Sequence, residues 1–213
     1  MATDREATSK RLRTIALVAG VAFCSAVIIT GAYEISHERI LENQRARLLA
    51  SLNSVIDDRY ASEVTAIELQ VPDGDEGDQI ERIFAMQRDA TLIAWVYAFV
   101  APQGYNGPIE MLAGIRPDGT ITRARVLQHR ETPGLGDGIE AEKSDWIHQF
   151  DGKSLSEPSV WALKVDNGTF DAMTGATVTP RAVVAGIESV LRYHSAHEPE
   201  LVAELERAET SPP

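Results

Sequence analysis

The chain has 213 residues, of which 44% are hydrophobic and 24% are charged, and this composition is close to that of an ordinary globular protein. Its net charge of −12 excludes a nucleic-acid-binding protein, because such proteins present a basic surface to the phosphate backbone. The single cysteine, Cys24, excludes an intrachain disulfide and any iron–sulfur or zinc site built from several thiolates of this chain.

Residues 14–33 are the first predicted element, and they contain no Asp, Glu, Lys or Arg. This run is apolar on every face and is long enough to cross a bilayer as a helix. The preceding residues 1–13 carry four basic side chains, so the positive-inside rule predicts that they stay in the cytoplasm. We therefore predict a single-pass protein of a bacterial inner membrane, with its acidic C-terminal domain in the periplasm.

Three other interpretations of this segment stay open. One is a helix buried in the core of a soluble domain, although the run begins close to the N-terminus. A cleaved signal peptide has a shorter apolar region, usually about 7–15 residues, which ends in small residues at the cleavage site. No clean site of that kind follows here. A lipoprotein would be acylated at Cys24, but Phe23 stands where a small residue is expected. A cysteine inside a membrane helix is the simpler interpretation.

Residues 34–60 are predicted to form a juxtamembrane helix, because their apolar side chains recur at helical spacing. Residues 72–78 are acidic and rich in turn formers, which predicts a solvated loop. A calcium-binding EF-hand is excluded there, because Phe84 stands at the position that requires glutamate when the pattern begins at Asp73.

Residues 61–197 are predicted to form one α+β domain with a mixed, partly antiparallel sheet. Runs of aromatic and β-branched residues predict strands, and glycine-rich turns join the first three of them as a hairpin or meander. The predicted strands are Thr91–Ala101, Ile109–Arg116, Thr120–Leu127 and Val160–Val165.

Two helices complete this predicted domain. One covers residues 138–150, and the other runs from Pro180 to about His194. Residues 198–213 form a polar tail that is expected to be frayed.

The segment Asp171–Pro180, with the sequence DAMTGATVTP, carries the most chemical information. Thr179 is a good N-cap and Pro180 is favoured at the first helical position, so a helix is predicted to begin here. The unpaired N–H groups and the dipole of a helix start favour an anion, and Gly175 permits a close approach of the backbone. On these residues alone, an ordinary capped helix with threonines that serve only the backbone stays an alternative.

The pattern Asp-x-x-Thr-Gly-Ala-Thr within this segment resembles the flavinylation motif of the FMN-binding domains in the Rnf and Na+-translocating NADH:quinone reductase families. Three further motifs match in the same order, namely the turn Gly104–Ile109, the hairpin Gly114–Ile121 and the loop His129–Gly136. The chain looks most similar to the G-subunit family of the Rnf (Rsx) complex. The C subunits of the sodium-pumping NADH reductase are close relatives.

This resemblance implies FMN as the cofactor, attached by a flavin transferase through a phosphoester to Thr177. It also implies a site that includes Thr174, Gly175 and Ala176, with Glu131 and Thr132 lying against the flavin ring. No side chain is expected to act as an acid, a base or a nucleophile, because the redox chemistry is that of the cofactor.

The resemblance further implies a subunit that relays electrons together with other membrane subunits, rather than a stand-alone catalyst. Such a complex couples electron transfer between NADH and ferredoxin to the movement of Na+ or H+. A freestanding extracytoplasmic flavoprotein and a non-redox anchored binding or assembly module are the alternatives. A metal site is not expected, because His194 and His197 could share a helix face but no third ligand is evident.

Overall fold

The computed structural model describes residues 20, 25, 46–57, 64–71 and 79–210. Most of the predicted membrane helix, the first part of the predicted juxtamembrane helix and the predicted acidic loop lie outside these residues. Within them, no helix is both long enough and apolar enough to span a membrane. The chain divides into two units, and the second unit, Leu49–Pro213, contains the sheet and its long helix.

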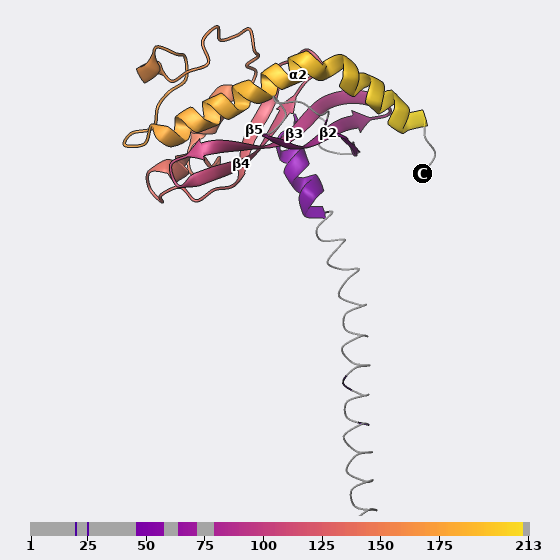
Figure 1. Ribbon diagram of the computed structural model, residues 1–213, viewed down its shortest axis with the longest axis horizontal. Coiled ribbons are helices and arrows are strands. Elements are labelled where there is room, and N and C mark those ends of the chain that lie inside the picture. The colour runs from indigo at the N-terminus through magenta and orange to yellow at the C-terminus, as the bar shows by residue number, and fades with distance from the viewer. Residues whose placement is uncertain (1–19, 21–24, 26–45, 58–63, 72–78, 211–213) are drawn as a thin grey trace, which may run out of the picture. The chain divides into compact units, whose positions relative to one another are not determined.

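A five-stranded antiparallel sheet forms the centre of this unit, and its strands are neighbours in chain order, as in a meander (Figure 1). Three predicted strands are confirmed as β3, β4 and β5, and the α+β class is confirmed with them. The prediction of a mixed sheet is wrong for the described residues, because all four strand pairs are antiparallel. The strands are β1 (Thr65–Leu69), β2 (Ile80–Arg88), β3 (Thr91–Gly104), β4 (Gly107–Ile115) and β5 (Ile121–Gln128).

Short 3-10 helices occupy the connection between β5 and the last helix. The predicted helix at residues 138–150 is instead two such segments, η3 (Gly136–Ile139) and η4 (Asp145–Phe150). The prediction of a strand at Val160–Val165 is also wrong. The chain there turns through η5 (Lys164–Asp166), which Asn167 ends in a left-handed conformation with φ of 62°.

Helix α2 (Val178–Thr210) packs against one face of the sheet, chiefly along β3 (Figure 1). The side chains of Trp95, Tyr97 and Phe99 are buried in the core on this face. A Cβ placed on Gly186 would lie 3.0 Å from the Cβ of Ala101, so the glycine permits close contact between helix and sheet.

The segment of residues 49–57 covers the opposite face. Val96 is buried there, because successive residues of β3 point to opposite sides of the sheet. Its cross-strand neighbour Gly114 lies against the carbonyl of Val55, and that carbonyl accepts a hydrogen bond from the hydroxyl of Thr122. Both faces of the sheet are therefore covered, and the site is built at one end of it.

Helix α2 does not end near His194 as predicted, but continues through Pro199 to Thr210. The prediction of a frayed tail is therefore wrong for residues 198–210. Leu201 and Leu205 are buried, and Glu204 Oε1 accepts a hydrogen bond of 2.8 Å from the backbone N–H of Gln70. The segment is polar in composition, but Leu201 and Leu205 share one face and pack on the domain.

Candidate cofactor-binding site

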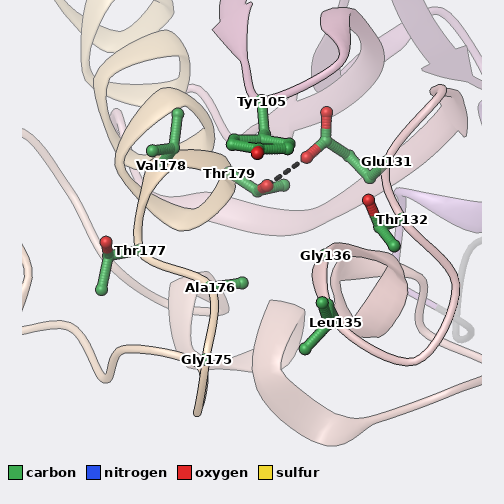
Figure 2. A pocket seen from close by; sticks show the side chains of 10 residues that line it. All are labelled: Tyr105, Glu131, Thr132, Leu135, Gly136, Gly175, Ala176, Thr177, Val178 and Thr179. Carbon is green, nitrogen blue, oxygen red and sulfur yellow. Dashed lines mark hydrogen bonds between the residues drawn. The ribbon is translucent and has the colours of Figure 1, made fainter.

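A cavity of about 280 Å³ lies beside the start of α2, where three segments that are distant in sequence meet (Figure 2). These are the turn between β3 and β4, the loop that follows β5, and the segment that leads into α2. Five of the six residues predicted for the site line the cavity, and the exposed Thr174 does not. The complete lining is Tyr105, Glu131, Thr132, Leu135, Gly136, Gly175, Ala176, Thr177, Val178 and Thr179.

Thr177, and not Thr179, is the N-cap of the helix, because α2 begins at Val178. The backbone N–H of Arg181 donates to the carbonyl of Thr177 over 3.2 Å, as the first intrahelical bond. The N–H groups of Val178 and Thr179 come before this bond and have no intrahelical acceptor. The positive end of the helix dipole therefore lies directly beside Thr177.

The turn before the helix is held at both ends. The carbonyl of Asp171 accepts a hydrogen bond of 2.6 Å from the indole N–H of Trp146, and its carboxylate pairs with Lys164 Nζ at 2.6 Å. The N–H of Ala176 donates to the carbonyl of Met173 over 3.2 Å. Gly175 lies inside this turn with φ of 79°, a conformation that explains the glycine of the motif.

Glu131 joins the three segments through its buried carboxylate. Its Oε1 accepts a hydrogen bond of 2.9 Å from the backbone N–H of Asn106, and its Oε2 accepts one from the hydroxyl of Thr179. A Cβ at position 136 would come within 2.9 Å of that Oε2, so the loop approaches Glu131 this closely only because residue 136 is glycine. The carboxylate thus has a clear structural role at the base of the cavity.

The loop that carries Glu131 and Thr132 is fixed from outside the cavity. The Nδ1 of His129 accepts the N–H of Glu131 over 3.0 Å, while Nε2 contacts Glu140 Oε1 at 2.7 Å. Neutral His129 therefore carries its proton on Nε2 in this network. Hydrogen bonds from Lys143 hold the pKa of Asp137 and the pKa of Glu140 below their usual values, and Asp137 in turn accepts the N–H of Gly134 over 2.7 Å.

Arg181 brings a permanent positive charge to Thr177. Its Nη1 lies 3.4 Å from Thr177 Oγ1, while Nε and Nη2 donate to the carboxylate of Asp166 over 2.6 and 2.8 Å. This pairing lowers the pKa of Asp166 and raises the pKa of Arg181. Figure 2 shows the side chain of Thr177 pointing away from the Thr179–Glu131 pair, so its hydroxyl lies on the outer side of the cavity.

Three further residues of the lining expose an apolar side chain, and the sequence motifs do not predict them. Tyr105 is 70% exposed, Leu135 49% and Val178 42%. Single exposed apolar side chains are common on proteins, but three that converge on one cavity are typical of a binding site. The local signal for them in the sequence is weak, namely the bulky Tyr105 in a glycine-rich turn.

These features fit a flavin nucleotide. The cavity has polar groups at its base and an apolar rim, as expected for a site that takes a flat aromatic ring. The N-terminus of α2 and Arg181 suit a phosphate. Among the residues that the structure describes, no group of three or more His, Cys, Asp or Glu side chains is arranged to hold a metal ion.

Comparisons with known proteins point to the same cofactor. The family described as FMN-binding domain matches residues 104–192. The G subunit of the ion-translocating oxidoreductase complex of Pseudomonas aeruginosa (strain UCBPP-PA14) is 53% identical over 110 residues, which are 51% of either chain. The matched part therefore spans about half the length of that relative.

Two other matches are more extensive. The protein of the same name from Vibrio cholerae serotype O1 (strain M66-2) is 34% identical over 195 residues, which are 89% of this chain and 93% of that relative. The crystal structure of Shewanella oneidensis NqrC superimposes with a TM-score of 0.51 at 20% identity, over 69% of this chain and 91% of that one, and it shows a shared fold. Because the Vibrio relative is matched over nearly its whole length, the chain belongs to the family of G subunits of ion-translocating oxidoreductase complexes.

Proposed function

We propose that this chain is a membrane-anchored flavoprotein subunit that relays electrons within an ion-translocating oxidoreductase complex, with FMN attached through its phosphate to Thr177. One observation carries this proposal. The hydroxyl of Thr177 lies at the positive end of a helix and 3.4 Å from a guanidinium nitrogen, beside a cavity with an apolar rim. A phosphate and a flat aromatic ring are the two parts of FMN that such an arrangement accommodates.

The residues of the chain would hold the cofactor rather than react with it. FMN supplies chemistry in which one or two electrons are taken up or released. The first N–H groups of α2 and the guanidinium of Arg181 stabilise the single negative charge that a phosphodiester retains. Covalent attachment also prevents loss of the cofactor by dilution outside the cytoplasm.

The proposed partners follow from the names of the relatives and from the sequence of the N-terminal part. Residues 14–33 would anchor the chain, with residues 1–13 in the cytoplasm and the FMN-binding domain in the periplasm. Other membrane subunits would form the pathway for Na+ or H+, because a single helix cannot enclose one. A flavin transferase would attach the FMN, and electron transfer between NADH and ferredoxin would drive the transport.

The attachment is tested by intact-mass measurement of the full chain after coexpression with a flavin transferase. We expect the wild type to gain the mass of FMN less one water, and we expect Thr177→Ala to gain nothing. Thr169→Ala is the matched control, because Thr169 is an exposed threonine outside the motif that does not line the cavity. Equal masses for the wild type and Thr177→Ala would refute the covalent link.

Membership of a complex is tested separately by affinity purification of the chain in mild detergent. Copurification of other subunits of an ion-translocating oxidoreductase is the expected result. Recovery of the flavinylated chain alone would instead support a freestanding extracytoplasmic flavoprotein. Recovery of an unmodified chain would support a non-redox anchored module.

A further inference from the structure

Tyr105 is exposed although its surroundings are rigid. The residue lies in the turn between β3 and β4, and its side chain is 70% exposed. An aromatic ring left in water forgoes the stabilisation that its burial would give, so the domain does not need this ring for its own core.

Hydrogen bonds on the next residue fix the position of the turn. The backbone N–H of Asn106 donates to Glu131 Oε1 over 2.9 Å, and its side-chain amide donates to the hydroxyl of Thr132 over 3.1 Å. A Cβ at position 104 would lie 2.3 Å from the carbonyl oxygen of Gly107, so the turn also requires glycine there. The backbone at Tyr105 is therefore held beside the cavity by bonds to residues that line it.

Apolar groups face this ring across the cavity. Figure 2 shows Tyr105 on one side, with Ala176 and Leu135 on the other and Val178 beside it at the start of α2. All four residues line the cavity, and they come from three separate segments. A flat aromatic ligand would bury the exposed faces of these side chains together.

We propose that Tyr105 is a flavin-binding residue whose ring stacks on the isoalloxazine ring of the FMN attached to Thr177, with Leu135 and Val178 covering the rest of the apolar surface. This inference rests on the proposed function. Offset stacking between aromatic rings adds to the free energy of burial, and a tyrosine on a fixed turn has only two side-chain torsions to immobilise.

Flavin fluorescence provides a direct test on the intact flavinylated chain. A tyrosine or tryptophan in van der Waals contact with an excited flavin donates one electron to it, and the electron returns when the charges recombine, so emission is quenched. Leucine and phenylalanine cannot quench in this way. We therefore expect Tyr105→Leu and Tyr105→Phe to raise the fluorescence lifetime and yield severalfold, and Tyr105→Trp to keep both low.

Accessibility of the ring to dissolved iodide gives a second readout. Leu135→Ala removes part of the apolar surface that covers the flavin ring and should increase quenching by iodide. Val202→Ala changes an exposed apolar side chain of α2 outside the cavity and should leave that quenching unchanged. Because these side chains are exposed, the thermal unfolding temperature should be nearly unchanged in all the variants.

The failure of this inference can be told apart from that of the proposed function. If the wild type carries no FMN by intact mass, the proposed function is wrong and the role of Tyr105 falls with it. If the wild type carries FMN but Tyr105→Leu and Tyr105→Trp have the same flavin lifetime as the wild type, Tyr105 does not contact the ring and the attachment to Thr177 stands.

Discussion

A row of contacts leads from the carboxylate of Asp166 through the guanidinium of Arg181 to the hydroxyl of Thr177. Asp166 holds Arg181 by two hydrogen bonds, and the remaining guanidinium nitrogen faces the threonine hydroxyl. The fork of an arginine can contact a carboxylate and a phosphate oxygen at the same time, which a lysine cannot do with the same geometry. Arg181 is thus placed to offset the negative charge of a phosphodiester without leaving its partner.

Replacing this guanidinium should slow the attachment of FMN. We expect Arg181→Gln to lower the initial rate of flavinylation by purified transferase roughly tenfold, because a hydrogen bond to a charged group contributes about 1.5–3 kcal/mol. Arg192→Gln is the matched control, since Arg192 is also an exposed arginine of α2 but pairs with Glu188. Equal rates for the wild type and Arg181→Gln would contradict this role.

The residues of the candidate site differ in how far the sequence predicts them. Gly175 and Thr177 belong to one short motif, and the local turn explains both. Local sequence assigns Thr179 to the cap, but its hydroxyl bonds to Glu131, which lies 48 positions earlier. Tyr105 escapes prediction for a similar reason, because neither its exposure nor its neighbours across the cavity can be read from the turn alone.

At the scale of elements, contacts with β3 position helix α2 and therefore Thr177. Besides the close approach at Gly186, the Nδ1 of His194 contacts the hydroxyl of Tyr97 at 2.8 Å in the core. The side chain of His194 is only 3% exposed, and its buried Nε2 has no hydrogen-bond partner among the residues that the structure describes. Burial lowers the pKa of His194, and the charge of Glu198 opposes part of this effect.

This burial should make the stability of the domain depend on pH. Because the pKa of His194 is lower in the folded state than the unfolded value of 6.5, the unfolded chain binds more protons as the pH falls through 6.5. The free energy of unfolding should therefore decrease from about pH 7.5 to about pH 5.5, which thermal melts would report. His194→Gln should flatten this decrease, and Tyr97→Phe, which keeps the buried histidine, should preserve it. An unchanged slope in His194→Gln would show that other groups dominate.

The elements also differ in how well local patterns predict them. Strands β3, β4 and β5 combine β-branched or aromatic residues with glycine turns, and tertiary contacts reinforce that preference. Strand β2, with the sequence IERIFAMQR, contains many residues that favour helices, and its burial between β1 and β3 overrides them. The second half of α2 has the composition of a polar tail, and only its packing shows that Leu201 and Leu205 are buried.

At the scale of the whole molecule, the proposal requires the FMN-binding domain and the transferase to be on the same side of the membrane. The first 13 residues carry basic side chains next to the predicted membrane helix, and the remainder of the chain is strongly acidic. Short basic segments stay in the cytoplasm, while acidic residues have little influence on orientation. The proposed orientation therefore depends on a few N-terminal side chains and not on the domain.

Fusions test this orientation and its cause together. A reporter enzyme that becomes active only outside the cytoplasm, fused after Pro213, should be active, and a reporter that fluoresces only in the cytoplasm should be dark at the same position. Replacing Lys10, Arg11 and Arg13 with glutamate should lower the active fraction, because it removes the charges that retain the N-terminus. Replacing the exposed domain residues Arg130, Arg192 and Arg207 with glutamate is the control, because it changes the net charge by the same amount outside the N-terminal segment, and it should leave reporter activity unchanged. Activity of the cytoplasmic reporter in the wild type would place the domain, and its FMN, on the opposite side of the membrane from the one proposed.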